Sequence, residues 1–370
     1  MSNSGSSQPP EAGFADQFEN ANSDEAPSPR QLHPIAKVAI GSVVGATAIW
    51  VVLSSAGGLG DALDAVRRMR PGFVVLAVGF AVIRLVLFGL QLLWLGRRTG
   101  PMGLLTALGL SLVVYGFGAV TPAAPAEGMA IASRELRRRG RTKRQARLTV
   151  GFSEWFAQRT FYAVAALDLI LVIALGHLSL VDSWPFMIVA IVVIVAIAGT
   201  AVAARRPASA AWIMGKLAAI RIRRPQPTPD VRRQSAGAWH AEAMAVIGSP
   251  GNRVRLALIS TFAVLADAAT LWATCHAAGF HIHPELAVLA RTVGTIASWI
   301  PLLPGGLGVV EVVIPAILHR FGAPLDDALA ATLVYRAVGT VLPALAGGLA
   351  MIALGTRHDR TLSLTAALEA

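Results

Sequence analysis

Residues 297–337 read ASWIPLLPGGLGVVEVVIPAILHRFGAPLDDALAATLVYRA, an apolar segment broken near its start by prolines and glycines. The break consists of Pro301, Pro304, Gly305, Gly306 and Gly308. Proline lacks a backbone donor and glycine loosens a helix, so we expect the backbone to leave helical geometry here. Irregular backbone at membrane depth is stable only where protein or water satisfies its polar groups. The pattern therefore predicts a broken helix beside a transport or binding site.

The composition of the whole chain indicates a polytopic membrane protein. Of its 370 residues 55% are hydrophobic and only 14% are charged, and the mean hydropathy is +0.60. The formal charge of +11 comes from Lys and Arg gathered in loops beside apolar spans. Such loops face anionic headgroups in the cytoplasm, so we expect no nucleic-acid partner. The single cysteine, Cys275, excludes an intrachain disulfide and a cysteine metal site.

We expect a membrane domain between two tails. Residues 1–33 are polar and acidic, as in disordered segments, and they lack the pattern of a cleaved signal peptide. The domain runs over 34–355, with a first half at 34–175 and a second at 184–355, and residues 356–370 form a short C-terminal tail. Apolar windows long enough to span a bilayer fall at 34–56, 72–95, 148–175, 184–204, 254–279 and 325–354.

Two further apolar stretches, about 104–121 and 286–302, run into proline-rich breaks and are followed by shorter helical segments at 126–139 and 307–321. We expect each pair to form a re-entrant hairpin. The halves share landmarks at similar spacing, which are Pro122 with Pro301, Pro125 with Pro304, and Arg159 with Arg336. The predicted fold is all-α, with two inverted repeats of three spanning helices and one broken-helix hairpin each. Inverted repeats with broken helices are a transporter architecture.

The placement of Lys and Arg sets the expected orientation. Residues 134–147 and the connection 205–255 are rich in both, whereas 176–183 and 280–285 contain neither. We therefore place the basic segments and both termini in the cytoplasm and the protein in the cell membrane. The basic connection is expected to hold anionic lipid. One loop disagrees, because it is predicted to be external and yet carries Arg67, Arg68 and Arg70.

The segment IPLLPGGLGVVEVV, followed by HRFGAPLDDALAATLVYR, is similar to the C-terminal signature of the flippase-like family, also called the lysylphosphatidylglycerol synthase transmembrane region. The segment VTPAAPAEGMAIASRELRRRG resembles the family's other marked segment, with Glu127 before Gly128 where the family has Gly-Glu. The resemblance covers roughly 34–355 and implies lipid translocation as a class, without naming a lipid. In multiple peptide resistance factors such a region is linked to moving lysyl-phosphatidylglycerol between leaflets, and other members are associated with polyprenol-linked sugars. We expect a stand-alone member without the aminoacyl-transferase domain.

Charged residues at membrane depth are the candidate substrate-binding residues. They form the pairs Arg336 with Glu311, Arg159 with Glu127, and Arg84 with Asp267. An unpaired charge in the middle of a span costs at least ~2.5 kcal/mol, so each arginine is expected to have an anionic partner. Arginine binds phosphate bidentately, which suits a lipid headgroup. For Arg336 the available anions are Glu311, Asp326, Asp327 or a lipid phosphate.

Each pair has a structural interpretation beside the functional one, because an ion pair can simply fasten two helices together. The alternatives left open are Arg291 or His276 as a local partner of Asp267, Glu154 as a partner of Arg159, and helix capping for Glu127. His281, His283 and Glu285 superficially resemble metal ligands. We expect no metal there, since no other clustered His or Cys completes the set.

The expected function is translocation of an anionic phospholipid, or of a polyprenyl-phosphate-linked lipid, between leaflets. The sequence LPGGLG lacks the GK[ST] ending of a phosphate-binding loop, so we expect no ATP and no cofactor. We find no catalytic motif and do not expect an enzyme. Two alternatives stay open, a membrane-embedded transferase acting on lipid-linked substrates and a non-transporting partner of a lipid or glycan synthase.

Overall fold

The structure is a computed structural model of the protein, and it describes residues 64, 66–117, 125–178, 244, 246–298, 306 and 308–353. Within these ranges all regular structure is helical, which confirms the predicted all-α class. Outside them lie the predicted spans 34–56 and 184–204, both predicted tails, most of the basic connection 205–255, and Pro122, Pro301, Pro304 and Gly305.

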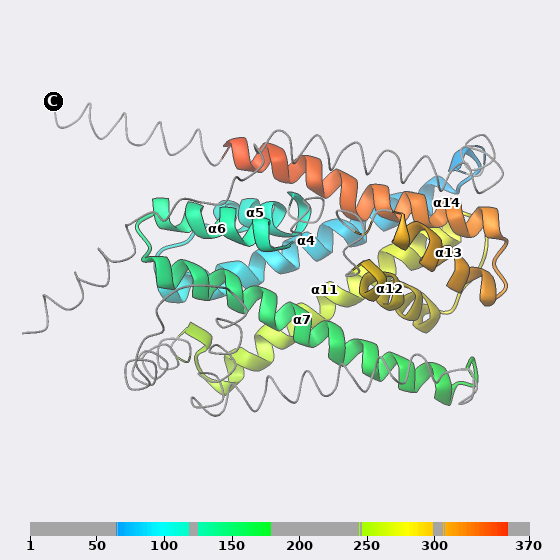
Figure 1. The fold of residues 1–370 in the computed structure, drawn as a ribbon, viewed down its shortest axis with the longest axis horizontal. Coiled ribbons are helices and arrows are strands. Elements are labelled where there is room, and N and C mark those ends of the chain that lie inside the picture. The colour runs from blue at the N-terminus through cyan, green and yellow to red at the C-terminus, as the bar shows by residue number, and fades with distance from the viewer. Residues whose placement is uncertain are drawn as a thin grey trace, which may run out of the picture.

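Four helices are long and apolar enough to cross a membrane (Figure 1). They are α4 (Pro71–Thr99), α7 (Lys143–Ala174), α11 (Pro250–Ala277) and the last span, Leu325–Ala353. The last span contains α14 (Leu325–Arg336) and the π-helical turn η4 (Ala337–Val341). At ~1.5 Å per residue each is longer than a ~30 Å hydrocarbon core. These helices correspond to four of the six predicted spans.

Helix α7 begins several residues before its predicted apolar window. Thr142 is its N-cap, and its Oγ1 accepts from the backbone N–H of Gln145 at 3.2 Å. The Gln145 side chain accepts in return from the backbone N–H of Thr142 at 3.2 Å. This capping box satisfies two donors that a helix start would leave unpaired. The polar turn from Lys143 to Arg147 is therefore helical, although hydropathy gives no sign of it.

Shorter helices pack beside the long ones. The first-half pair is α5 (Leu104–Ser111), which continues into the π-helical turn η1 (Leu112–Gly116), and α6 (Pro125–Arg138). The second-half pair is α12 (Pro284–Ser298) and α13 (Val309–Arg320). Figure 1 shows the first pair toward one end of the long helices and the second pair toward the other end. Pro125 is the first residue of α6, where its missing N–H has no helical acceptor to lose.

Close backbone contacts hold the short helices in place. A Cβ on Gly116 would lie 2.1 Å from the carbonyl oxygen of Pro343, and one on Gly347 would lie 2.3 Å from that of Leu112. Helix η1 and the last span therefore touch backbone to backbone. Small residues allow such approach, and in lipid this packing replaces the hydrophobic effect as the force between helices.

The break before α13 has the non-helical backbone that the sequence predicts. Gly306 has φ 66° and Gly308 has φ 82°, a left-handed region that favours glycine. A Cβ on Gly306 would also lie 2.3 Å from the Cβ of Ser298, at the end of α12. These two glycines give the chain its non-helical backbone directly before α13.

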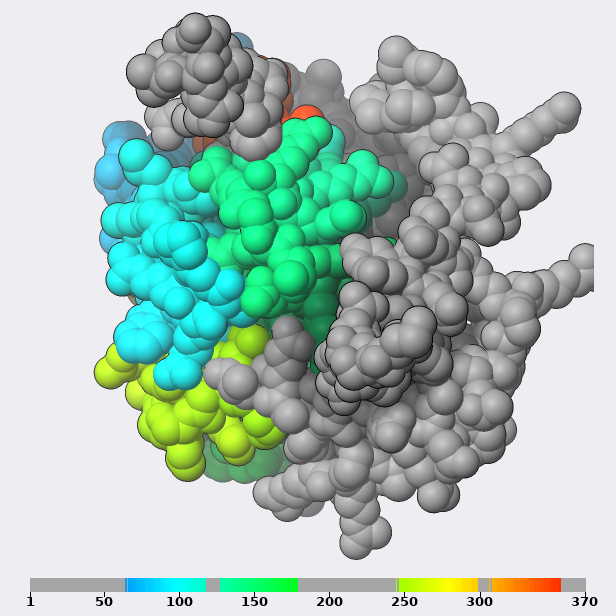
Figure 2. Space-filling view, turned by 90° about the vertical axis from the view of Figure 1, so that its left-hand side faces the viewer, coloured from blue at the N-terminus to red at the C-terminus, as the bar shows by residue number. Residues whose placement is uncertain are grey.

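The loops gather at two ends of the bundle. At one end the backbone N–H of Arg70, before α4, donates to the carbonyl of Ala277, the last residue of α11, at 2.9 Å. At the other end the buried Arg141 guanidinium donates to the carbonyls of Gly96 and Pro101 at 2.7 and 3.0 Å. Figure 2 shows this second end, where α4, α6 and the start of α11 lie together.

The basic segment 134–147 lies at the end that holds Arg141, whereas the loop with Arg67, Arg68 and Arg70 lies at the opposite end. Arg67 is exposed and pairs with Asp64 at 3.4 Å. The conflict in the sequence prediction therefore remains in the structure. Arg67, Arg68 and Arg70 lie at the same end as the loops that contain no Lys or Arg.

Candidate functional site

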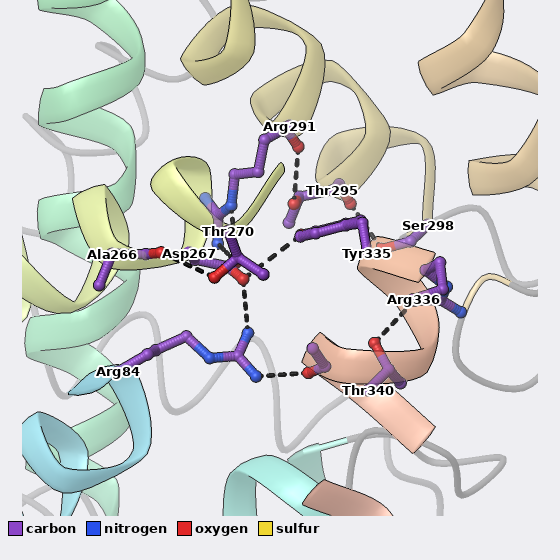
Figure 3. A network of polar contacts seen from close by, with 11 residues as sticks. Arg84, Ala266, Asp267, Thr270, Arg291, Thr295, Ser298, Tyr335, Arg336 and Thr340 are labelled. Carbon is purple, nitrogen blue, oxygen red and sulfur yellow. Dashed lines mark hydrogen bonds and ion pairs between the residues drawn. The ribbon is translucent and has the colours of Figure 1, made fainter. Parts of the chain in front are cut away.

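Asp267 lies at the centre of a buried ionic network in the middle of α11 (Figure 3). Its Oδ1 accepts from Arg84 Nη1 at 2.7 Å, and Arg84 lies halfway along α4. Its Oδ2 accepts from Nε and Nη2 of Arg291 on α12, each at 2.8 Å. The Tyr335 hydroxyl also donates to Oδ1, at 3.4 Å. One carboxylate therefore joins α4, α11, α12 and α14.

A second ion pair lies next to the first, because Arg336 follows Tyr335 in α14. Arg336 Nε donates to Glu311 Oε1 at 2.9 Å, and Arg336 Nη1 donates to Thr340 Oγ1 at 3.3 Å. The other Glu311 oxygen accepts from the backbone N–H of Gly308 at 2.7 Å. Glu311 lies in the first turn of α13, where the helix dipole favours a carboxylate.

We call Arg84, Asp267, Arg291, Glu311 and Arg336 the arginine–carboxylate cluster. Its side chains are only 3–14% exposed, and three guanidinium groups face two carboxylates. The cluster therefore has a formal excess of one positive charge. Arg84 Nε and Arg291 Nη1 are buried and have no hydrogen-bond partner. Each unpaired buried donor costs about 1–3 kcal/mol, which an anion with several oxygens would recover.

An apolar cavity of about 350 Å³ adjoins the cluster. It lies between α4, the α5–η1 segment and the last span, and its lining includes Val82, Leu85, Leu112 and Leu342. Arg84 does not line the cavity, but its Nη2 donates at 2.5 Å to the carbonyl of Gly339, which follows the lining residue Val338.

Both π-helical turns contribute to this cavity. Leu112 belongs to η1, and Val338 belongs to η4. The Gly339 carbonyl that accepts from Arg84 also belongs to η4. π-Helical turns are rare and frequent at functional sites, because they expose backbone groups that an α-helix keeps bonded. Their position around one cavity is a reason to regard it as part of the site.

The first-half candidates have separate surroundings. Glu127 is half-buried in the first turn of α6. The Arg159 guanidinium lies 4.3 Å from the centre of the Trp155 ring, a cation–π contact. Glu154 accepts from the Gln158 side chain at 2.8 Å. Four of the six predicted residues, Arg84, Asp267, Glu311 and Arg336, lie together in the structure although they are far apart in the sequence. The other two, Glu127 and Arg159, are not part of this cluster.

Arg291 and Tyr335 were not among the site residues predicted from the sequence. Arg291 carries the same signal as Arg84, a charge within an apolar stretch, and it was considered only as an alternative partner of Asp267. The structure shows that Asp267 pairs with both arginines. Tyr335 gave no such signal, because a tyrosine in a span is also an ordinary packing residue.

The structure brings a further histidine to the HIHPE segment, although no other His or Cys is clustered with that segment in the sequence. His177, in the turn after α7, hydrogen-bonds through Nε2 to Glu285 Oε1 at 3.0 Å. Its ring centre lies 5.2 Å from that of His283. Residues more than a hundred positions apart meet here because α7 and α12 pack together, and no local pattern reports such a contact.

These features define an all-helical, multi-pass membrane protein with a charged network in its interior. Residues 35–347 match the family described as the lysylphosphatidylglycerol synthase TM region, and the chain belongs to that family. The family links the protein to lipid metabolism or translocation. No curated protein matches the sequence.

Proposed function

We propose that the protein moves an anionic phospholipid, or a polyprenyl-phosphate-linked lipid, between the two leaflets without ATP. The observation that carries this proposal is the excess positive charge of the arginine–carboxylate cluster at mid-span. A lipid phosphate would accept from Arg84 Nε and Arg291 Nη1, the two buried donors that have no partner. A charge alone in hydrocarbon is very costly, so a headgroup needs such donors to pass.

The apolar cavity supports a lipid rather than a small soluble anion. Its lining residues, such as Leu85 and Leu342, suit an acyl or prenyl chain, and Arg84 donates to the Gly339 carbonyl beside the lining residue Val338. In this arrangement the phosphate rests on the cluster while the chain occupies the cavity or the surrounding bilayer. The membrane lipid is thus the proposed partner, and neither a cofactor nor a catalytic step is part of the proposal.

The carboxylates make binding reversible. Asp267 and Glu311 already occupy several guanidinium donors, so a phosphate must compete with them for Arg84, Arg291 and Arg336. Competition weakens phosphate binding and returns the arginines to an ion-paired state when the lipid leaves. A transporter needs this property, because a lipid held too tightly would not be released.

We also propose that α5–η1 with α6, and α12 with α13, are re-entrant hairpins of inverted repeats. Arg139, just after α6, donates to Thr106 near the start of α5 at 3.2 Å, so the outer ends of that pair meet. In the second pair a Cβ on Gly294 of α12 would lie 2.6 Å from Ile314 of α13, which requires close side-by-side packing. The domain limits, the cell-membrane location, the cytoplasmic termini and anionic lipid at the basic connection belong to the same proposal.

The test is a leaflet-translocation assay with purified protein in liposomes, with and without a proton gradient. Labelled phosphatidylglycerol and a labelled short polyprenyl phosphate are supplied separately, and protein-free liposomes are the control. We expect transport of at least one lipid without ATP, and its loss in Arg336→Ala and Glu311→Gln. Folded wild-type protein that moves neither lipid under any condition would contradict the proposed function.

A further inference from the structure

Three potential metal ligands meet at the end of the bundle where α7 ends and α12 begins. They are His177, His283 and Glu285, and one ligand atom from each lies within 4.8 Å of the other two. His177 Nε2 is 3.0 Å from Glu285 Oε1, and His283 Nδ1 is 3.9 Å from the same oxygen. This group is separate from the arginine–carboxylate cluster and has no part in the proposed lipid path.

We propose that His177, His283 and Glu285 form a binding site for a divalent transition-metal cation, best suited to Zn²⁺. Two imidazoles and a carboxylate are a common ligand set for zinc, with the fourth position left to water. Imidazole favours zinc and its neighbours over magnesium or calcium, which prefer oxygen ligands.

The distances fit this ion. Tetrahedral ligands at ~2.0–2.2 Å from zinc lie about 3.3 Å from one another. The two separations from Glu285, 3.0 and 3.9 Å, lie on either side of that value, and the third, between His177 and His283, is within 4.8 Å. The remaining adjustment falls to His283, whose side chain is 70% exposed and free to turn. Glu285 is 11% exposed and supplies the fixed ligand.

A second carboxylate makes the site more attractive to a cation. Asp168 of α7 is buried, and its Oδ2 has no hydrogen-bond partner. Its charge and that of Glu285 repel one another, and a bound cation would offset this repulsion. Asp168 is therefore a second acidic group whose interaction with Glu285 favours a cation at the three ligands.

Zinc at this position would fasten α7 to α12. Beneath the ligands the two helices already share an apolar contact that includes Leu169, Val172, Leu286 and Leu289. The alternative interpretation is a plain hydrogen bond between His177 and Glu285 that joins the same two segments without metal. A variant without His283 distinguishes the metal site from the plain hydrogen bond, because it deletes a metal ligand and leaves the bond between His177 and Glu285 intact.

The experiment is calorimetric titration of the full chain in detergent with Zn²⁺ after removal of metal by a chelator. We expect one tight site whose affinity falls at least ~10-fold in His283→Ala, His177→Ala and Glu285→Gln, as for lost zinc ligands and their supports. His281→Ala is the matched control, since His281 lies on the same loop but makes an edge-to-face contact with His276, with ring centres 4.9 Å apart. The Zn²⁺ affinity of His281→Ala should equal that of the wild type.

A second readout replaces Zn²⁺ with Co²⁺. The visible absorption of Co²⁺ is intense when the ion has four tetrahedral ligands. We expect this absorption in the wild type and in His281→Ala, and its loss in His283→Ala. Thermal unfolding of each variant without metal shows whether the fold is retained. Absence of tight binding, equal affinity in wild type and His283→Ala, or equal loss in His281→Ala would each overturn the proposal.

Discussion

Asp267 holds two guanidinium groups with one carboxylate, and both contacts are buried. Its position explains why α4, α11, α12 and α14 meet in one arrangement. A buried ion pair adds little net stability, because both charges lose their water, but a buried charge left alone is costly. The main contribution of Asp267 is therefore to neutralise Arg84 and Arg291.

Asp267→Asn should lower the free energy of unfolding by about 3–5 kcal/mol, because it leaves two buried arginines without a counter-charge. Thermal or denaturant unfolding in detergent measures the loss. The exposed Asp326→Asn is the matched control and should change little. The double variant Asp267→Asn with Arg291→Gln should recover part of the loss, since one uncompensated charge is removed. A neutral single substitution would show that the network is not structural.

Sequence reasoning anticipated part of this network. Depth within a span identified Arg84 and Arg336 as residues that need partners, and the structure pairs them with Asp267 and Glu311. The position of the charges within the spans did not predict that Asp267 also binds Arg291, because that contact depends on the rotation of α12 about its own axis. His177 escaped notice for a similar reason, since its neighbours come from a distant segment.

The elements combine features that sequence patterns detect with features that they miss. Hydropathy located α4, α7, α11 and the last span to within a few residues, because long apolar runs are a strong signal. It gave no sign of η1 and η4, since a π-helical turn has no distinctive composition. Both turns border the cavity beside Arg84, so they matter for the proposed site.

Gly347→Ala tests the contact between η1 and the last span. The new Cβ would lie 2.3 Å from the carbonyl oxygen of Leu112, so the two segments must separate. We expect unfolding stability to fall by at least ~1–3 kcal/mol, as for other overpacked positions. Gly348→Ala is the adjacent control, because a Cβ there meets nothing within 4 Å. Equal effects at both positions would rule out the proposed contact.

The described loops lie at two ends of the molecule, and the basic segment 134–147 lies at the end opposite Arg67. We propose that the basic end faces the cytoplasm, as the charge rule for membrane topology predicts. The sequence predicts the same two sets of loops, but it leaves the conflict at Arg67 open. The charge rule counts Lys and Arg in each loop and carries no information on where the loop lies in the fold.

Single cysteines test the orientation in a Cys275→Ser background. Arg67 and Arg137 are both exposed and lie at opposite ends, so Arg67→Cys and Arg137→Cys form a matched pair. A membrane-impermeant maleimide should label Arg67→Cys in intact cells and Arg137→Cys only after permeabilisation. The reverse pattern would invert the proposed orientation, and labelling of both from one side would contradict the arrangement of the ends.

The central claim is that the arginine–carboxylate cluster carries the lipid phosphate across the membrane. The most direct measurement is the liposome translocation rate of the lipid that the wild type moves, compared with the rates of Arg291→Ala and Arg67→Ala. Arg67 is an exposed arginine before α4, outside both the arginine–carboxylate cluster and the basic connection 205–255, so it controls for the loss of a positive charge.

We predict that Arg291→Ala lowers the rate by ~10-fold or more, as expected for the loss of charge-assisted hydrogen bonds. The rate of Arg67→Ala should stay within about twofold of the wild type, because surface charges away from a site contribute little. Equal rates in the wild type and in folded Arg291→Ala would show that the phosphate does not pass through this cluster.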